Sequence, residues 1–305
     1  MNGGKSEPLN ISRGRRRSGE RVIEFLLAGC AAVSVLVTVL VVFILLRESI
    51  AFFAEVPARD FITGTRWSPT FEDAQFGVLP LVTGSLLVAG GAATVAVPLG
   101  LLTAIYLSEY AGERNRARLK PALEVLAGIP TVVYGYFALT FVTPLIRAVV
   151  PGADVFNAAS ASFVVGVMII PTVASLSEDA MRAVPGSLRE AAFGLGATKM
   201  ETTVRVVLPA AVSGIVASFV LGLSRAIGET MAVTIAAGSF PNLTLDPFSS
   251  IQTMTAYMVQ VSLGDTPQGT VVYRTLFVVG LALFLITLGM NVVSQWIVSR
   301  YGEER

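Results

Sequence analysis

The stretch PGSLREAAFGLGATKMETTVRVVLP, from Pro185 to Pro209, gathers charges, small residues and helix-start signals in a chain otherwise made of long apolar runs. Two places fit the capping-box pattern, in which a Ser or Thr and a Glu three residues later satisfy the first free N–H groups of a helix: Ser187–Glu190 and Thr198–Glu201. Gly194 and Gly196 lie between them and permit a tight turn. The stretch is therefore predicted to form two short helices joined by a turn.

The first of these helices has an apolar stripe. Leu188, Ala191, Ala192 and Leu195 recur at positions i, i+3, i+4 and i+7. Isolated helices this short are marginal in water, so they need a surface to pack against. Two interpretations stay open at this point: the pair packs on the protein's own ends, or it docks on a partner.

The composition is that of a membrane protein. Of the 305 residues, 53% are hydrophobic and only 14% are charged, and the mean hydropathy is +0.71. A soluble domain carries about 25% charged residues. The net charge of +1 gives no reason to expect a nucleic acid as a partner. The chain has no histidine, one cysteine and no G-x-x-x-x-G-K-[ST] phosphate loop, so neither His-based catalysis nor ATP hydrolysis by this chain is expected.

Six apolar runs reach the length of about 20 residues that a bilayer-spanning helix needs. They are residues 25–46, 79–107, 122–147, 159–177, 211–237 and 272–298. The fold class expected is therefore an all-α membrane protein with six transmembrane helices. The first run follows a basic segment but is longer than the apolar core of a cleaved signal peptide, so an uncleaved span is expected.

The distribution of Lys and Arg predicts the orientation. Most of the 22 fall in four segments that alternate with the outer loops: 1–24, 108–121, 178–210 and 299–305. Positive charge concentrates on the cytoplasmic side of membrane proteins. Both termini and the 185–209 stretch are therefore expected in the cytoplasm, with outer segments at 47–78 and 238–271. The expected organisation is a basic tail (1–24), a first helix with its outer loop (25–78), a transport domain (79–298) and a short tail (299–305).

The 185–209 stretch resembles the EAA loop of ABC importer permeases. The matching positions are Glu190, Ala191, Ala192, Gly196, Leu208 and Pro209, with Val206 where Ile is common. The resemblance implies the permease fold of type I importers. It also implies that these residues couple the chain to a separate ATP-hydrolysing subunit, by helices that sit in a cleft of that subunit.

The fifth run contains two charges, Arg225 and Glu229. Charged side chains are costly inside a bilayer and usually mark a pathway or a partner. Their four-residue spacing puts both on one face of a continuous helix, where they would be able to neutralise each other. Alternatively, Arg225 contacts an oxyanion substrate, since the guanidinium matches phosphate geometry. Glu229 would then limit the affinity for the anion or form a gate contact.

Three further strings resemble the PstC-type permease of high-affinity phosphate importers: AGIPTVVYGYFAL (Ala127–Leu139), SRAIGETMAV (Ser224–Val233) and GTRWSP (Gly64–Pro69). The resemblance covers essentially the whole chain. It implies that Arg225 and Glu229 are needed for phosphate transport. The implied partners are a PstA-type second permease, two copies of the ATPase, which would hold ATP and Mg, and a periplasmic phosphate-binding protein. A prokaryotic inner membrane is the implied location, and no cofactor is expected in this chain.

Weaker polar features allow two interpretations each. Pro130, Thr131, Tyr134, Pro171 and Thr172 either line a path or belong to Pro-kinked, packed helices, and the second is favoured. The charges around Glu109 and Glu113 suggest a solvated loop. Those at Glu178, Asp179 and Arg182 suggest the capped end of the fourth span, and Asn291 and Gln295 are candidates for bonds between helices.

The leading functional hypothesis is a phosphate importer permease. Alternatives are a permease for molybdate or sulfate, a passive anion channel, and a membrane-embedded enzyme. The enzyme is disfavoured because the chain lacks histidine and has a single carboxylate inside a span, Glu229.

Overall fold

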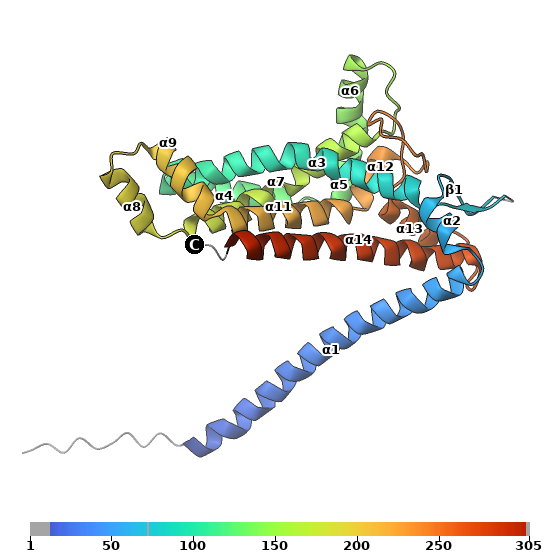
Figure 1. The fold of residues 1–305 in the computed structure, drawn as a ribbon, viewed down its shortest axis with the longest axis horizontal. Coiled ribbons are helices and arrows are strands. Elements are labelled where there is room, and N and C mark those ends of the chain that lie inside the picture. Colours follow the sequence, from blue (N-terminus) through green and yellow to red (C-terminus); the bar gives the residue numbers. More distant parts are fainter. Residues whose placement is uncertain (1–12, 72, 303–305) are drawn as a thin grey trace, which may run out of the picture.

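The computed structural model describes residues 13–71 and 73–302 as a bundle of long helices (Figure 1). Twelve residues of the predicted N-terminal tail, with Lys5, and residues 303–305 of the C-terminal tail, with Arg305, lie outside the described residues. Figure 1 shows two ends of the bundle: α8 and α9 lie at one, and α2, β1 and α13 lie at the other.

Five helical segments in the described chain are long and apolar enough to cross a membrane, and one bent pair makes up to six. The five are Glu20–Phe53, Leu79–Tyr110, Thr131–Val149, Ala158–Arg182 and Val271–Trp296. They correspond to α1 (Arg13–Phe53), α3 (Leu79–Ile105) with the π-helix η1 (Tyr106–Tyr110), α5 (Thr131–Phe137) with η2 (Ala138–Val142) and α6 (Thr143–Val149), α7 (Ala158–Arg182), and α14 (Val271–Gly302).

The predicted start of the third span, residue 122, is wrong, because the span begins at Thr131. Residues 113–127 form a separate helix, α4 (Glu113–Ala127), none of whose side chains is buried. The chain breaks at Gly128–Pro130, and α5 begins after Pro130, which stands at the N-cap position. Pro130 therefore starts a helix and does not kink one, because proline lacks the N–H that a helix interior requires but the first turn does not.

The predicted fifth span is a broken one. α9 (Lys199–Thr202), η3 (Thr203–Val207) and α10 (Leu208–Ala210) lead into α11 (Val212–Ile227) across a bend of 71°. α11 ends at Ile227, and a separate helix, α12 (Met231–Ala237), follows after three residues. The run 211–237 is therefore not one continuous helix.

The core lies where α3, α7 and α11 pack together with α5 and α12. Small residues let α3 and α7 approach closely: a Cβ added at Gly100 would lie 2.7 Å from a methyl of Val173, and one at Gly91 would lie 2.5 Å from the Ser162 hydroxyl. Close approach through small residues is typical of membrane helices, where van der Waals packing replaces the hydrophobic effect. Ser177 of α7 and Ser218 of α11 add a buried hydrogen bond of 2.7 Å between their hydroxyls.

The α2–β1 end of the bundle carries a small aromatic core. α2 (Ala58–Thr63) is followed by a two-stranded antiparallel sheet of β1 (Trp67–Ser68) and β2 (Gln75–Phe76), in which Trp67 pairs with Phe76. Edge-to-face ring contacts join Phe52, Phe61, Trp67, Phe76 and Tyr257. These contacts fix the segment after α1 on the bundle.

The segment after α12 is packed into the bundle, although the sequence suggested an outer loop. Residues 251–257 are buried, and α13 (Met254–Leu263) begins within them. The Met254 amide donates to the Ser85 hydroxyl of α3 at 3.0 Å. Gly84 is required at this contact, since a Cβ there would lie 2.5 Å from the Gln252 carbonyl oxygen.

α1 stands apart from the other helices. It meets the bundle at its C-terminal end, beside α14, and its N-terminal part runs away from the bundle (Figure 1). No residue of its most apolar 18-residue window is buried. A membrane or another chain must cover this surface, because so long an apolar helix is unfavourable in water.

Candidate functional site

The 185–209 stretch forms two short helices joined by a turn, as predicted. The first is α8 (Gly186–Gly194) and the second begins with α9. Gly196 in the turn has φ of +84°, a conformation that glycine adopts without strain. We call these two helices the α8–α9 pair.

One of the two predicted capping boxes is present. The Glu201 amide donates to the Thr198 hydroxyl at 3.3 Å, and the Thr198 amide donates to the Glu201 carboxylate at 2.9 Å. The predicted box at Ser187–Glu190 is wrong, because α8 has Pro185 as its N-cap residue and no side-chain cap. A proline at that position sets the chain direction but supplies no side-chain acceptor.

The α8–α9 pair presents apolar side chains to the outside. Of the predicted stripe only Ala192 is buried, whereas Leu188 is 44% and Leu195 is 90% exposed. Phe193 is also half exposed. Glu190 and Ala191 are exposed, while Leu208 and Pro209 are half-buried at the far end of the stretch. The pair therefore does not bury its apolar side chains on the protein's own ends.

Arg225 lies near the end of α11 and is exposed. One guanidinium nitrogen donates to the Thr172 hydroxyl of α7 at 3.1 Å. A guanidinium has five donors, so this bond leaves others available to an anion. Thr172 is the member of the predicted path-lining group that contacts Arg225.

Glu229 lies outside α11, in the break before α12. Its carboxylate accepts from the Ala232 amide at 3.3 Å, and its carbonyl oxygen accepts from the Thr255 hydroxyl at 2.8 Å. The side chain is buried. It therefore satisfies a free N–H group in the first turn of α12, in the manner of an N-cap.

The prediction that Arg225 and Glu229 share a helix face is wrong, because the helix ends between them at Ile227. No ion pair joins these two residues in the described part of the chain. They are also far from the α8–α9 pair, since α11, 16 residues and about 24 Å long, lies between. The sequence-predicted residues thus form two separate sites.

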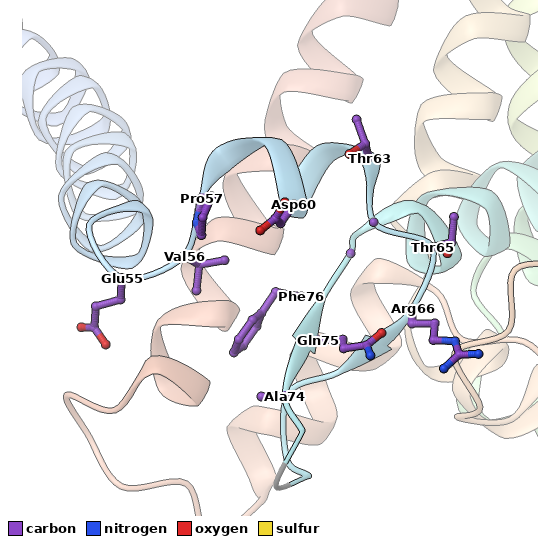
Figure 2. Close-up of a pocket in the computed structure, with 12 residues that line it drawn as sticks. Glu55, Val56, Pro57, Asp60, Thr63, Thr65, Arg66, Ala74, Gln75 and Phe76 are labelled. Atoms are coloured by element: carbon purple, nitrogen blue, oxygen red, sulfur yellow. The ribbon is translucent and has the colours of Figure 1, made fainter.

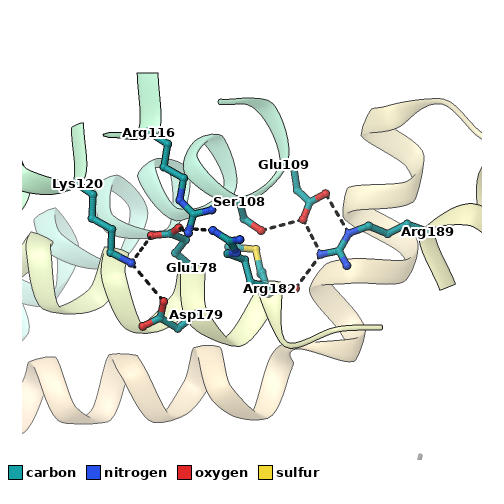
Figure 3. Close-up of polar contacts among 9 residues, drawn as sticks. Ser108, Glu109, Arg116, Lys120, Glu178, Asp179, Arg182 and Arg189 are labelled. Atoms are coloured by element: carbon teal, nitrogen blue, oxygen red, sulfur yellow. Dashed lines mark hydrogen bonds and ion pairs between the residues drawn. The ribbon is translucent and has the colours of Figure 1, made fainter. Parts of the chain in front are cut away.

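Charged side chains form an ion-pair cluster near the α8–α9 pair (Figure 3). Glu178 of α7 is completely buried and pairs with Arg116 and Lys120 of α4 and with Arg182 of its own helix. Lys120 also contacts Asp179 at 3.5 Å. The interpretation of Arg116 as part of a solvated loop is wrong, and so is that of Glu178 as a helix cap, because the two bind α4 to α7.

A second ion pair joins Glu109 of η1 to Arg189 of α8, with 2.9 Å between Oε1 and Nη2 (Figure 3). Both side chains are largely sheltered from solvent, so Glu109 is not in a solvated loop. Arg189 also donates to the carbonyl oxygens of Met181 and Val184, at the end of α7. Sequence patterns did not single out Arg189, because its partner Glu109 is 80 residues away and no local pattern identifies it.

The other polar predictions have mixed outcomes. The Tyr134 hydroxyl donates to the Leu126 carbonyl across the break between α4 and α5, at 2.8 Å. Pro171 is buried inside α7, as expected for a packed helix. Asn291 does bond between helices, because its side-chain oxygen accepts from the Ser224 hydroxyl at 3.3 Å.

A polar cavity of about 520 Å³ lies at the α2–β1 end (Figure 2). Glu55, Asp60, Thr63, Arg66 and Gln75 are among its lining residues. It is far from Arg225 in the chain and shares no lining residue with the α8–α9 pair. No group of three or more His, Cys, Asp or Glu side chains in the described chain is placed to hold a metal ion.

Residues 96–302 match the model of the family described as binding-protein-dependent transport system inner membrane component. The chain belongs to this family. The permease is 34% identical over 297 residues to the probable ABC transporter permease protein YqgH of Bacillus subtilis, covering 97% of this chain and 96% of that protein. It is 31% identical to the phosphate transport system permease protein PstC of Haemophilus influenzae, covering 95% and 98%.

Solved structures of ABC importers share the fold of the permease. A bacterial importer of the acidic polysaccharide alginate matches with a TM-score of 0.56 at 16% identity, over 93% of this chain and 99% of that one. The methionine transporter MetNI, in an inward-facing conformation, matches with a TM-score of 0.54 at 19% identity, over 74% and 94%. At this identity the likeness concerns the fold alone.

Proposed function

We propose that the permease is the transmembrane subunit of an ATP-driven importer of inorganic phosphate. The observation that carries the proposal is Arg225, a cation with free donors beside the Thr172 hydroxyl, in a helix, α11, that carries no other charged residue. Such a pair suits a tetrahedral oxyanion, which accepts several hydrogen bonds at once. The relatives named PstC support phosphate as the anion.

The α8–α9 pair is the proposed docking element for the ATP-hydrolysing subunit. Its exposed Leu195 and Phe193 leave apolar surface that binding to another chain would bury. The EAA residues Glu190, Ala191, Ala192, Gly196, Leu208 and Pro209 lie in this stretch. Glu190 is exposed on α8 and makes no helix cap, so in this proposal it contacts the ATPase.

Glu229 has a different proposed role from the one that its spacing suggested. Its carboxylate holds the start of α12 and its carbonyl holds Thr255, so it keeps the break between α11 and α12 in one geometry. The break begins at Gly228, three residues after Arg225. We therefore expect the geometry of the break to influence where the Arg225 guanidinium lies. Loss of Glu229 would disturb transport through the position of Arg225.

The family supports the general composition of the proposed assembly. It contains a PstA-type second permease, two copies of the ATPase with their ATP and Mg, and a periplasmic phosphate-binding protein. We propose a prokaryotic inner membrane as the location, with both termini and the α8–α9 pair in the cytoplasm, where most Lys and Arg would then lie. This chain would hold no cofactor and would bind no nucleic acid.

A permease for molybdate or sulfate is the second candidate, since Arg225 and Thr172 also suit these anions. A passive anion channel would need Arg225 but no exposed α8–α9 pair. The exposed Leu195 therefore favours an ATP-driven importer over the channel.

The test is uptake of labelled phosphate, molybdate and sulfate into vesicles that contain the complete complex. Wild type is expected to take up phosphate only when ATP is present. Arg225→Gln is expected to lower uptake about ten- to a hundredfold, because a hydrogen bond to a charged group is worth about 1.5–3 kcal/mol. Arg118→Gln on α4 is the matched control and should behave as wild type. Uptake that survives without ATP, or is unchanged in Arg225→Gln, contradicts the proposal.

A further inference from the structure

Both helices of the α8–α9 pair are attached to the same five-residue segment. η1, with the sequence YLSEY, continues α3 and ends at Tyr110. From α8, Arg189 forms its ion pair with Glu109. From α9, the Lys199 ammonium lies over the ring of Tyr110, 5.0 Å from its centroid. Two adjacent residues of η1 therefore each contact one helix of the pair.

The contact with Arg189 is the stronger of the two. The guanidinium donates to both carboxylate oxygens of Glu109, with Nη2 to Oε1 at 2.9 Å and Nε to Oε2 at 3.4 Å. The Ser108 hydroxyl donates to the same carboxylate at 2.9 Å (Figure 3). Only 20% of the Arg189 side chain and 8% of the Glu109 side chain is exposed. Salt screens this pair little because both side chains are sheltered from solvent. Two hydrogen bonds between the same two groups also fix their relative orientation, and not only their distance.

The π-helical hydrogen bonding of η1 suits it to change position when Arg189 moves. Its hydrogen bonds run from residue i to i+5, as Ala111 N–H to the Tyr106 carbonyl does at 2.7 Å. π-Helices are rare, occur mostly as single turns within α-helices, and are frequently found at functional sites. The helix that precedes it, α3, packs along α7 through Gly91 and Gly100. A shift of η1 would therefore act on the core of the bundle.

We propose that η1 is the element through which movement of the α8–α9 pair reaches α3, with Glu109 and Tyr110 as positioning residues held by Arg189 and Lys199. The proposal rests on the proposed function as an ATP-driven permease. The ATPase would move α8 and α9 together, and the two contacts would transmit that movement to α3.

A purely structural role for Arg189 is the alternative. Arg189 also donates to the Met181 and Val184 carbonyl oxygens, at 2.8 and 2.7 Å. It therefore satisfies free carbonyl groups at the C-terminal end of α7. Substitution of Arg189 would remove both functions at once. Substitution of Glu109 and Tyr110 leaves the carbonyl bonds in place and removes only the link to η1.

The experiment compares wild type with the double variant Glu109→Ala/Tyr110→Leu in the complete complex. The ATPase is expected to co-purify and to hydrolyse ATP at the basal rate, but the phosphate moved per ATP is expected to fall about fivefold or more, the size of a typical coupling between sites. Glu113→Ala, an exposed acidic residue at the start of α4, is the matched control. An unchanged ratio in the double variant overturns the proposal, as does loss of ATPase binding, which would make the contacts part of docking.

A second variant and a second readout keep the test decisive. Glu109→Gln/Lys199→Met removes both charges with little change in volume, and it should lower the same ratio. Hydrogen exchange of the η1 amides should change on addition of a non-hydrolysed ATP analogue in wild type and not in either variant. This readout needs no phosphate, so a complex that responds at η1 but fails to import phosphate contradicts the proposed function and leaves the role of η1 intact. Equal responses in wild type and variants overturn that role.

Discussion

Arg225 and Glu178 are charged residues of the bundle, and their surroundings differ. Glu178 has three cations around it and no exposed surface, so its charge is fully compensated. Arg225 has one neutral partner, Thr172, and remains exposed. The first arrangement holds α4 against α7, and the second leaves a cation available for a ligand.

The Thr172 hydroxyl is expected to orient the Arg225 guanidinium for binding of the anion. Thr172→Val keeps the shape of the side chain and removes the hydroxyl that Arg225 contacts. The concentration of phosphate for half-maximal uptake should rise about tenfold or more, as expected for loss of a hydrogen bond to a charged group, which is worth about 1.5–3 kcal/mol. Thr140→Val on η2 is the control, because its hydroxyl bonds only the Tyr136 carbonyl of its own helix. Equal uptake in the two variants would contradict this role.

Glu178 is expected to be important for stability. Glu178→Ala removes the buried partner of Arg116 and Lys120. Because these two cations are partly exposed and water can solvate them, the expected cost is about 1–3 kcal/mol of unfolding free energy. Asp179→Asn serves as the control, since its side chain is 59% exposed and its pair with Lys120 is worth about 0–1 kcal/mol. Unfolding of the detergent-purified permease measures both. A loss in Asp179→Asn as large as in Glu178→Ala would argue against the difference in burial.

At the scale of elements, local signals succeeded where the partner of a residue is close in sequence. The Thr198–Glu201 box was predictable because its hydrogen bonds span three residues. The identical pattern at Ser187–Glu190 failed because Pro185 already sets the start of α8. The breaks at 128–130 and 228–230 escaped the sequence because apolar runs continue through them. At the second break the Glu229 carbonyl is satisfied by a distant side chain, Thr255, which hydropathy does not record.

The two capping patterns make a matched pair of variants. Thr198→Ala removes both hydroxyl contacts with Glu201 and should cost about 1 kcal/mol of unfolding free energy. Ser187→Ala removes no cap and should change it by less than about 0.5 kcal/mol. Thermal unfolding of both variants measures the difference. A larger loss from Ser187→Ala would mean that α8 is capped in a way the structure does not show.

At the scale of the whole molecule, the apolar runs predicted the order of the membrane helices, and they predicted the number six correctly only if the bent pair around Ala211 counts as one span. α1, α3, α7 and α14 lie where the runs placed them. The runs did not predict that 251–257 packs into the bundle, since this segment is too short for a span and its burial depends on Gly84 and Ser85 of α3. Arg225 and Glu229 were chosen as candidates because they are charged residues in an apolar run. The sequence did not predict that α11 ends between them.

The orientation remains a prediction of the whole chain, and it is testable. A reporter enzyme active only outside the cytoplasm should be inactive when fused at either terminus, because most Lys and Arg would otherwise have to cross the membrane. The same reporter inserted at Asp73, between β1 and β2, should be active. Activity at one terminus and not the other would contradict an even number of spans.

The π-helical geometry of η1 changes the direction in which its side chains point around the helix axis. Each residue of an α-helix turns the chain by about 100°, and a π-helical turn holds one residue more than an α-helical one. The difference from an unbroken α3 therefore grows along η1 to about 100° at its end, where Glu109 and Tyr110 lie. Removal of Leu107 from this segment would restore α-helical phase, keep every charge in the chain, and still rotate the Glu109 and Tyr110 side chains away from Arg189 and Lys199.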